Sequence, residues 1–365
     1  MSSKKINVAI IFGGKSAEHE VSLQSARNVY KAIDKEKYNP ILIGIDKSGK
    51  WLLNEDSSFL INADNPQLIS LNASQHPITL VPECNGQICS TLNQQHVNTI
   101  DVAFPILHGP LGEDGTVQGF LKLANIPFVG SSVLGSAVGM DKDVMKRLLR
   151  DAGIPIAKFL TLHVSDEQPS FETLVQHFGL PLFIKPANMG SSIGVHKVKN
   201  ESDYQHALKD AFSFDVKVII EEYIEGREIE CAVLGNQHPI TSTVGEIITN
   251  HEFYGYETKY IDENGATIEI PAQLSDDTLN QAREVALRTF KVLSCEGLGR
   301  VDMFLTASGK IFVNEINTMP GFTQISMYPK LWEASGISYP ALIDKLIQLA
   351  LERHEQSKRL KNSYL

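Results

Sequence analysis

The chain has 365 residues, 42% hydrophobic and 21% charged, which is enough for about two to three globular domains. Acidic residues outnumber basic residues 43 to 33, for a net charge of -10, which argues against a protein that binds duplex nucleic acid. No stretch approaches the ~18 apolar residues of a membrane span, and the apolar run at residues 8–12 is too short for a signal peptide. The four cysteines lack zinc-site spacing. We therefore expect free thiols in a cytoplasmic protein that binds neither nucleic acid nor a membrane.

The first 130 residues alternate between strand and helix patterns. Three short apolar runs are typical of buried strands: residues 8–12, 41–45 and 101–107. Apolar residues at helical spacing follow the first run, at positions 26, 29, 30 and 33. This alternation predicts a doubly wound parallel sheet, in which ligands bind beyond the carboxyl ends of the strands. The polar segment 50–98 is interpreted as an addition to this unit rather than part of its core.

Strand patterns dominate the second half of the chain. Strands are expected at residues 182–185, 194–197, 218–223 and 228–234, and a hairpin at 300–317. Helices are expected between Asp141 and Gly153, at about 276–293 and at about 340–354. A hydrophilic insert runs from 250 to 269. Together these patterns predict an α+β fold with antiparallel sheets.

Two polar residues fall at the expected carboxyl edge of the parallel sheet, Glu20 and His108. A carboxylate in the first turn of a helix is favourable for the helix dipole, so Glu20 has a structural explanation. Binding of a substrate ammonium group is an equally good functional explanation. The preceding segment, residues 13–16, matches neither a Walker A loop nor a dinucleotide-binding fingerprint, and we interpret it as a strand-to-helix turn.

A loop of small residues, 190–194, follows Lys185-Pro186 and leads into the next expected strand. Small side chains let backbone N–H groups approach phosphate oxygens, and the lysine adds positive charge. A Gly-Ser-Ser loop by itself is usually a hairpin turn. The lysine before the loop and the strand after it favour a phosphate-binding flap.

The hairpin at 300–317 brings acidic residues together. If residues 308–309 form a two-residue turn, two pairs face each other on one side of the sheet: Asp302 with Glu315, and Arg300 with Asn317. Like charges across a strand pair repel, and a divalent cation between them would resolve the repulsion. Oxygen ligands without His or Cys select Mg²⁺ or Mn²⁺. A one-residue bulge that turns the acids to opposite faces is the less favoured alternative.

Magnesium, a lysine and a glycine flap together predict phosphoryl transfer without a Walker A loop. In this interpretation an adenosine site follows the apolar strand 218–220, lined by Glu221, Tyr223, Ile224 and Glu228.

Several motifs then match a known family: the chain resembles the D-alanine–D-alanine ligases of the ATP-grasp superfamily over nearly its whole length. The matching segments are His19–Ser22, Leu107–Gly115, Met140–Lys142, Lys185-Pro186 with 190–194, Lys259-Tyr260, Gly299–Asp302 and Asn314–Thr323. The polar segment 50–98 is longer than the family pattern and touches none of these motifs.

The resemblance implies an ATP-grasp fold with ATP held between the second and third of three domains. These would be an N-terminal substrate-binding domain at 1–130, a central lid domain at 131–218 and a C-terminal catalytic domain at 219–365. It also implies a reaction. ATP phosphorylates one D-alanine, and the amine of a second attacks the acyl phosphate to form D-alanyl-D-alanine for peptidoglycan. A homodimer is expected from the family alone.

Residue roles carried over by the resemblance fall into four groups. ATP is bound by Lys142, Lys185, Glu221, Tyr223, Ile224 and Glu228. Two Mg²⁺ (or Mn²⁺) are held by Asp302, Glu315 and Asn317. Catalysis is assigned to Glu20, Ser191, Tyr260, Arg300 and the backbone N–H of Gly321. The substrates are bound by His108, Lys259, Ser326 and Met327, under a mobile loop at 250–269.

Two alternatives stay open. A ligase of the same fold would join D-alanine to D-lactate or another acceptor, and a tyrosine at Tyr260 favours the amine instead. The other alternative is a catalytically silent ATP-binding regulator. Intact ligand and lysine positions argue against it: Arg300, Asp302, Glu315, Asn317, Lys142 and Lys185.

Overall fold

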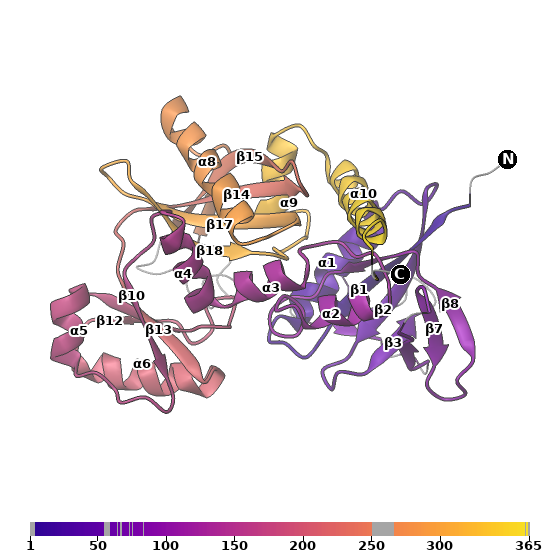
Figure 1. The fold of residues 1–365 in the computed structure, drawn as a ribbon, viewed down its shortest axis with the longest axis horizontal. Helices are drawn as coiled ribbons and strands as arrows, with labels where there is room; N and C mark the ends of the chain where they lie inside the picture. Colours follow the sequence, from indigo (N-terminus) through magenta and orange to yellow (C-terminus); the bar gives the residue numbers. More distant parts are fainter. Residues whose placement is uncertain are drawn as a thin grey trace.

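A computed structural model describes residues 4–54, 59–63, 65, 68–72, 74, 76–82, 84–249, 266–361 and 363. Its three larger sheets lie around helix α3 (Val133–Met140), with the N-terminal sheet and the central sheet at opposite ends of the molecule (Figure 1). None of the helices in these ranges is both long enough and apolar enough to cross a membrane.

The N-terminal sheet has the strand order β3-β2-β1-β9. Its strands are β1 (Ile6–Gly13), β2 (Tyr38–Ile45), β3 (Trp51–Asn54) and β9 (Val102–Pro105). β1 pairs in parallel with both β2 and β9, as predicted, whereas β3 adds an antiparallel edge. Residues 8–12 are fully buried because α1 (His19–Ala32) packs on the face of Ile10, and α2 (Thr116–Leu123) packs on the face of Ile11.

The segment 50–98 contributes to the core, so the interpretation as an addition outside it is wrong. Its short strands form two small antiparallel sheets: β4 (Leu60–Ile61) with β5 (Ser70–Leu71), and β6 (Ile78–Leu80) with β7 (Gln87–Ser90) and β8 (His96–Thr99). Ile78, Leu80 and Ile88 belong to the same buried cluster as Ile11 of β1. The segment is rich in Asn and Gln, so its average composition gives no indication of these few buried apolar residues.

The central sheet is antiparallel throughout, in the order β10-β13-β11-β12. Its elements are β10 (Phe159–His163), α5 (Phe171–Phe178), β11 (Leu182–Pro186), β12 (His196–Val198), α6 (Glu201–Phe214) and β13 (Lys217–Glu222). Leu182 and Ile184 pack with Leu174 of α5 and Ala211 of α6 in a core of their own. All of β13 pairs within this sheet, so the boundary expected between residues 218 and 219 falls inside a strand.

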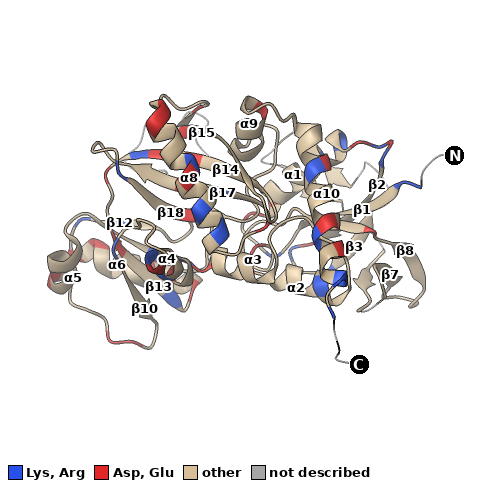
Figure 2. Cartoon of the chain, turned by 45° about the horizontal axis from the view of Figure 1, so that its top comes forward, with Lys and Arg blue, Asp and Glu red and all other residues tan. Residues whose placement is uncertain are grey.

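The C-terminal sheet is also antiparallel, in the order β16-β15-β14-β17-β18. Its strands are β14 (Arg227–Gly235), β15 (Ile240–Thr249), β16 (Ala266–Glu269), β17 (Gly297–Leu305) and β18 (Ile311–Asn317). Its helices are α8 (Asp276–Val292), α9 (Met327–Ala334) and α10 (Tyr339–Lys358). The insert expected at 250–269 is therefore shorter, because its last four residues form β16. Acidic and basic residues both occur along α8 and along α10, so neither helix carries charges of one sign only (Figure 2).

Two hydrophobic cores join segments that are far apart in sequence. Leu342 and Leu346 of α10 belong to the same core as Ile10 of β1, and α10 contacts α1 and β9 beside the N-terminal sheet (Figure 1). Met145 of α4 (Lys142–Asp151) packs with Phe290 of α8. The packing therefore does not follow the expected domain ranges, since α4 adjoins the C-terminal sheet and α10 covers the N-terminal one.

Candidate active site

Two loops leave the carboxyl edge of the parallel sheet and meet there. The first follows β1 and carries Glu18, the residue directly before α1. The second follows β9 and carries His108 and Gly109. A Cβ on Gly109 would lie 2.7 Å from Ser16 Oγ and 2.9 Å from Glu18 Oε2, and φ is +77° there, so this approach requires glycine. The edge expected to bind ligand is thus built from both loops.

Glu18, and not Glu20, faces the loop at residues 190–194, which was predicted to be a phosphate-binding flap and is called the flap below. The Ser191 hydroxyl donates a hydrogen bond to the Glu18 carboxylate. Glu20 is turned toward Lys47, with its Oε1 2.6 Å from the lysine Nζ, and its side chain is 37% exposed. Glu20, which was expected to take part in catalysis together with Ser191, is therefore directed away from this loop. The carboxylate that reaches the flap lies two positions earlier in the chain.

His108 is buried between the N-terminal domain and the loop after β18. Its Nδ1 lies 3.0 Å from the Met319 carbonyl oxygen, and its Nε2 lies 3.3 Å from Ser25 Oγ. Burial lowers the pKa of His108, although the charge of Glu18 acts in the opposite direction. The ring is therefore neutral at neutral pH and joins two segments that approach the site from different parts of the chain.

Glu113 is a half-buried carboxyl group that the sequence motifs did not single out by function. It accepts hydrogen bonds from the backbone N–H groups of Gly109 (2.7 Å) and Met319 (3.2 Å). Burial, with a further contribution from the nearby Glu18 charge, raises the pKa of Glu113 to about 8. Glu113 thus connects the two loops that present His108 and the residues after β18.

A cavity of about 330 Å³ lies between the central and C-terminal sheets. This volume is in the range of small-molecule sites. Its walls carry seven of the residues expected to bind ATP or metal: Lys142, Lys185, Glu221, Tyr223, Ile224, Glu228 and Glu315. Gly190 and Ser192 of the flap line it as well. The structure therefore brings together segments of β11, β13, β14, β18 and α4 that the motifs had assigned to one nucleotide site.

Glu221, at the wall of this cavity, is paired with two lysines. It forms an ion pair with Lys185 and a second one with Lys146, whose Nζ lies 2.9 Å from Glu221 Oε2. Burial opposes ionisation, but the two ammonium groups lower the pKa of Glu221 to about 2. Lys146 is 1% exposed and was missed, although it lies one helical turn after Lys142. Two lysines on one carboxylate leave excess positive charge, which suits a polyphosphate.

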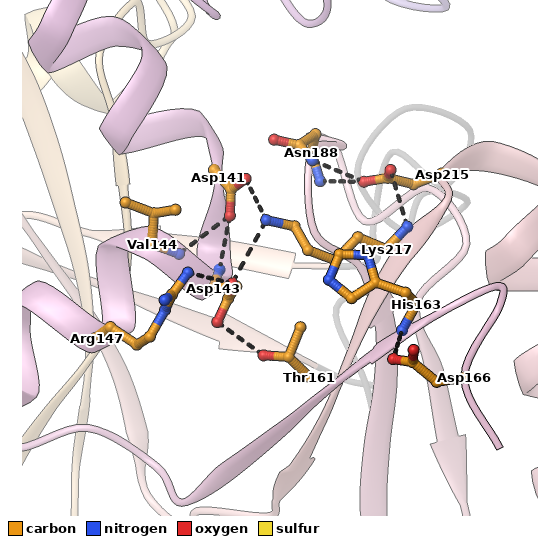
Figure 3. A network of polar contacts seen from close by, with 10 residues as sticks. All are labelled: Asp141, Asp143, Val144, Arg147, Thr161, His163, Asp166, Asn188, Asp215 and Lys217. Atoms are coloured by element: carbon orange, nitrogen blue, oxygen red, sulfur yellow. Dashed lines mark hydrogen bonds and ion pairs between the residues drawn. The ribbon is translucent and has the colours of Figure 1, made fainter. Parts of the chain in front are cut away.

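A network of ion pairs fixes the start of α4 (Figure 3). Asp141 caps this helix by accepting hydrogen bonds from the backbone N–H groups of Asp143 and Val144. Lys217 of β13 donates to Asp141 at 2.5 Å and lies 3.5 Å from Asp143. The helix that carries Lys142 and Lys146 is therefore tied to the central sheet at its first turn.

Lys142 lies between Asp141 and Asp143 in the sequence, and its side chain lines the cavity. Its ammonium group donates to the Met189 carbonyl at 2.7 Å and lies 3.3 Å from Glu315 Oε2. In the same network, Asp215 accepts hydrogen bonds from the backbone N–H (2.8 Å) and side-chain amide (2.9 Å) of Asn188 (Figure 3). Lys217 and Asp215, at and just before the start of β13, thus fix the first turn of α4 and the residues that precede the 190–194 loop.

The flap itself has an unusual backbone. Ser191, Ser192 and Gly194 all have left-handed φ angles, of 51°, 58° and 67°. A Cβ on Gly194 would lie 2.8 Å from the Phe214 ring and 2.9 Å from Pro186, so only glycine fits this turn. Non-glycine residues persist in this region when the surroundings hold them, which is common at ligand-binding loops.

The β17–β18 hairpin confirms the expected register but not the expected turn. Two pairs face each other as predicted: Asp302 with Glu315, and Arg300 with Asn317. The connection spans residues 306–310, with a left-handed Gly309, and is longer than two residues. A bulge at Asn314 restores the register before the acids are reached. Asn314 then receives a hydrogen bond from Lys185 at 3.3 Å.

Cationic side chains compensate the paired acids. Arg300 donates from Nε and Nη2 to the two oxygens of Asp302, each at 2.7 Å, and Asn317 donates to Asp302 at 2.9 Å. Lys142 compensates Glu315. The repulsion that argued for a divalent cation is therefore already relieved within the protein.

The donor set at this hairpin still fits Mg²⁺ or Mn²⁺. Two carboxylates and one amide oxygen are hard ligands, and Mg²⁺ bound through one or two carboxylates completes its shell with phosphates and water. Within the described part of the chain, no three or more His, Cys, Asp or Glu residues gather into a metal site. Any ion at Asp302, Glu315 and Asn317 would therefore depend on ligands from a bound nucleotide.

The segment after β18 leads to the N-terminus of α9. Ser326 is the residue before the helix, and its Oγ accepts a hydrogen bond from the Thr323 N–H at 3.1 Å. Met327 begins the helix and is buried, and Gly321 lies beside Ser326. A helix N-terminus favours an anionic group, as the expected binding of a substrate carboxylate requires. Lys259 and Tyr260 lie outside the described residues, as do residues 250–265 of the expected mobile loop.

Two antiparallel sheets that close on a lysine-lined cavity, beside a parallel-sheet domain, define the ATP-grasp architecture. The family models described as D-ala D-ala ligase N-terminus and C-terminus match residues 7–131 and 148–348. This chain belongs to the D-alanine–D-alanine ligase family, whose members are ATP-dependent ligases.

Individual relatives agree over the full length. The D-alanine–D-alanine ligase of Shouchella clausii is 57% identical over 361 residues, 98% of each chain. The D-alanine–D-alanine ligase of Coxiella burnetii is 37% identical with a TM-score of 0.84, covering 98% of this chain and 97% of that one. The VanG D-Ala:D-Ser ligase of Enterococcus faecalis is 38% identical with a TM-score of 0.84, covering 95% and 100%.

Proposed function

We propose that this protein joins two molecules of D-alanine to D-alanyl-D-alanine with the conversion of ATP to ADP and phosphate, as a step in making the peptidoglycan precursor. The observation that supports this most is the cavity between the two antiparallel sheets, with Lys142, Lys185 and Glu315 on its walls, in a chain that matches ligase relatives over its full length.

The reaction activates a carboxylate, which is otherwise a poor electrophile. An oxygen of the first D-alanine carboxylate attacks the γ-phosphorus of ATP, and the bond to the bridging oxygen breaks to release ADP. The amine of the second D-alanine, after losing a proton, attacks the acyl carbon. The carbon–oxygen bond to phosphate then breaks, which leaves the dipeptide and inorganic phosphate.

Each part of the cavity has a role in this proposal. Lys142 and Lys185 hold the phosphates. The adenosine lies against Tyr223, Ile224 and Glu228, and Glu221 keeps Lys185 in place. Asp302, Glu315 and Asn317 would hold two Mg²⁺, or Mn²⁺, which offset charge on the triphosphate and on the transferring phosphoryl group when bound.

Glu18 replaces Glu20 as the proposed partner of the first substrate's ammonium group. It lies beside His108 and accepts a hydrogen bond from the flap through Ser191, whereas Glu20 is paired with Lys47. Arg300 and the Gly321 N–H are proposed to stabilise the oxyanion. The second substrate's carboxylate meets the α9 N-terminus at Ser326 and Met327.

The choice of second substrate depends on the part of the chain around Tyr260. We propose that Lys259 and Tyr260 close over the site and that the tyrosine hydroxyl favours an amine over a hydroxyl nucleophile. VanG, a D-Ala:D-Ser ligase, shares this fold, so acceptor choice varies among related proteins. Purified protein with ATP and equal D-alanine, D-serine and D-lactate should yield mainly D-alanyl-D-alanine. Tyr260→Phe should gain ester from D-lactate below neutral pH, where the α-amine is mostly ammonium.

Phosphate release from ATP is the direct test of the proposed function. It should depend on Mg²⁺ and on D-alanine, and L-alanine should not replace D-alanine. If phosphate release did not depend on D-alanine, the protein would be a ligase for other substrates. If no phosphate were released, the protein would be a nucleotide-binding regulator. We also propose a homodimer in the cytoplasm, and light scattering of the purified protein checks the dimer.

A further inference from the structure

A third carboxylate lies in line with the two acids of the β17–β18 hairpin. Glu230 of β14 is paired in register with Asp302 of β17, which is itself opposite Glu315 of β18. Because directly opposite residues of an antiparallel sheet share one face, the three acids form a row across three strands. Glu230 is 2% exposed, and a buried carboxylate is costly unless a cation compensates it.

Arg300 is the cation that serves Glu230 and Asp302 together. Its Nε donates to Asp302 Oδ1 at 2.7 Å, and Glu230 Oε2 lies 2.8 Å from the same nitrogen. A guanidinium Nε carries one hydrogen, so the two carboxylates are alternative acceptors for it. Ala232 lies opposite Arg300 on β14, and its small side chain leaves room for the guanidinium beside Glu230.

This arrangement matters for cation binding, because both Asp302 oxygens already accept hydrogen bonds from Arg300. Asp302 Oδ2 also accepts a hydrogen bond from Asn317 at 2.9 Å, so both lone pairs of this oxygen are used, and a divalent ion that binds it must displace Arg300 or Asn317. A guanidinium that leaves Asp302 needs another anionic acceptor, since a buried unpaired charge is strongly unfavourable. Glu230 lies within reach of the displaced group without movement of the backbone.

We propose that Glu230 is a positioning residue that accepts the Arg300 guanidinium when a divalent cation occupies Asp302. Glu230 thereby lowers the cost of metal binding and keeps Arg300 beside the reacting groups. This inference rests on the proposed function for the identity of the cation and the nucleotide, but it concerns an equilibrium that exists without turnover.

The test measures Mn²⁺ binding by electron paramagnetic resonance of the free ion, with ADP present and D-alanine absent. Glu230→Gln should weaken Mn²⁺ binding about tenfold, the size of one charge-assisted hydrogen bond. Raising Mg²⁺ should restore much of the lost turnover, because the metal-bound form is reached at higher concentration. Glu230→Asp keeps the charge and should bind Mn²⁺ more tightly than Glu230→Gln.

A double-mutant cycle separates this role from simple loss of negative charge near the ion. If Glu230 acts through Arg300, adding Glu230→Gln to Arg300→Met should change Mn²⁺ affinity little. An equal weakening in both backgrounds would mean general electrostatics and would overturn the proposal. Glu246→Gln is the matched control, because Glu246 is a buried acid of the same sheet paired with Arg227.

The remaining outcomes are also decisive. Unchanged Mn²⁺ affinity in Glu230→Gln, with the protein folded by circular dichroism, would contradict the proposal and leave the ligase activity untouched. A wild type that binds no Mn²⁺ with ADP would remove the metal site of the proposed function, and the inference with it. If Glu230→Gln does not fold, the Glu230→Asp and Arg300→Met variants carry the comparison.

Discussion

Among the carboxyl groups near the loops after β1 and β9, Glu113 has the most strongly shifted pKa. Its pKa is raised from 4.5 to about 8, first by burial and then by the Glu18 charge. Between these two values the folded protein holds a proton that the unfolded chain has released. The stabilisation from this group is therefore complete below pH 4.5, and it is lost as the pH rises through about 8.

We accordingly expect Glu113→Gln to flatten the pH dependence of stability. The free energy of unfolding of the wild type, from denaturant titrations between pH 5 and pH 8.5, should fall more steeply with pH than that of the variant. Glu284→Gln removes an exposed acid on α8 and should keep the wild-type slope. Parallel curves for wild type and Glu113→Gln would show that Glu113 is ionised throughout this range.

Glu315 lies at the hairpin that we propose to bind metal, and Lys142 compensates its charge. Glu315→Gln should lower ligation about 100-fold or more, because an amide is a poorer ligand for a hard cation. Its free energy of unfolding without metal should fall by about 1–3 kcal/mol, since Lys142 is buried and loses its anionic partner but keeps its hydrogen bond to the Met189 carbonyl. Activity across a Mg²⁺ titration and thermal unfolding measure the two effects. Near-normal activity at low Mg²⁺ would exclude a role in metal binding.

Single residues were the hardest part of the site to predict. Glu18 and Glu20 flank the start of one helix, and only the path of the flap decides which of them receives the Ser191 hydroxyl. Lys146 belongs to no recognised motif, because its role depends on an ion pair with Glu221, which lies on the central sheet and is distant in sequence. Long-range approach of this kind leaves no periodic signal in the chain.

At the scale of whole elements, the sequence was more informative. The parallel pairing of β1 with β2 and β9 was predicted by the alternation of strand and helix patterns, and the antiparallel second half was predicted by its strand runs. The β17–β18 register was right for a partly wrong reason. A longer turn moved the pairing by one residue, and the bulge at Asn314 moved it back. Turn length and bulges depend on local backbone angles that residue type constrains only weakly.

The start of α4 gives a prediction about an element. Lys217→Met removes the cation that joins Asp141 and Asp143 to the central sheet. The first turn of α4 should then loosen and displace Lys142. We expect the KM for ATP to rise about tenfold, equivalent to about 1.4 kcal/mol, with a smaller change for D-alanine.

Steady-state kinetics in both substrates measure this split. Lys217→Arg keeps the charge and should stay close to the wild type. Lys158→Met is the matched control, because its ammonium group is exposed and lies 3.7 Å from Glu222 at the other end of the same strand. If Lys217→Met affected both KM values equally, the network would stabilise the fold without directing the lysine.

At the scale of the whole molecule, α10 is the element that connects the two ends of the chain. Leu346 is 1% exposed in the core that it shares with the N-terminal sheet. Leu346→Ala should lower the free energy of unfolding by about 3 kcal/mol. Leu360→Ala, at a side chain that is 70% exposed, should change it by less than about 0.5 kcal/mol.

The fluorescence of the two tryptophans reports separately on the N-terminal sheet and on the C-terminal region. Trp51 lies in β3 and Trp332 in α9. In single-tryptophan variants, the Leu346→Ala substitution should shift both unfolding midpoints together, because one core joins the two regions. A shift confined to Trp332 would show that the N-terminal sheet is stable without α10.

The position of α10 in the chain also has a consequence for synthesis. The ribosome completes β9 at residue 105 but reaches α10 only at residue 339. At about 5–20 residues per second, this interval lasts about 10–50 s. During that time the face of the N-terminal sheet that carries Ile10 lacks the helix that later covers part of it. We expect the nascent chain to bind chaperones through this apolar face, and to finish folding only after release.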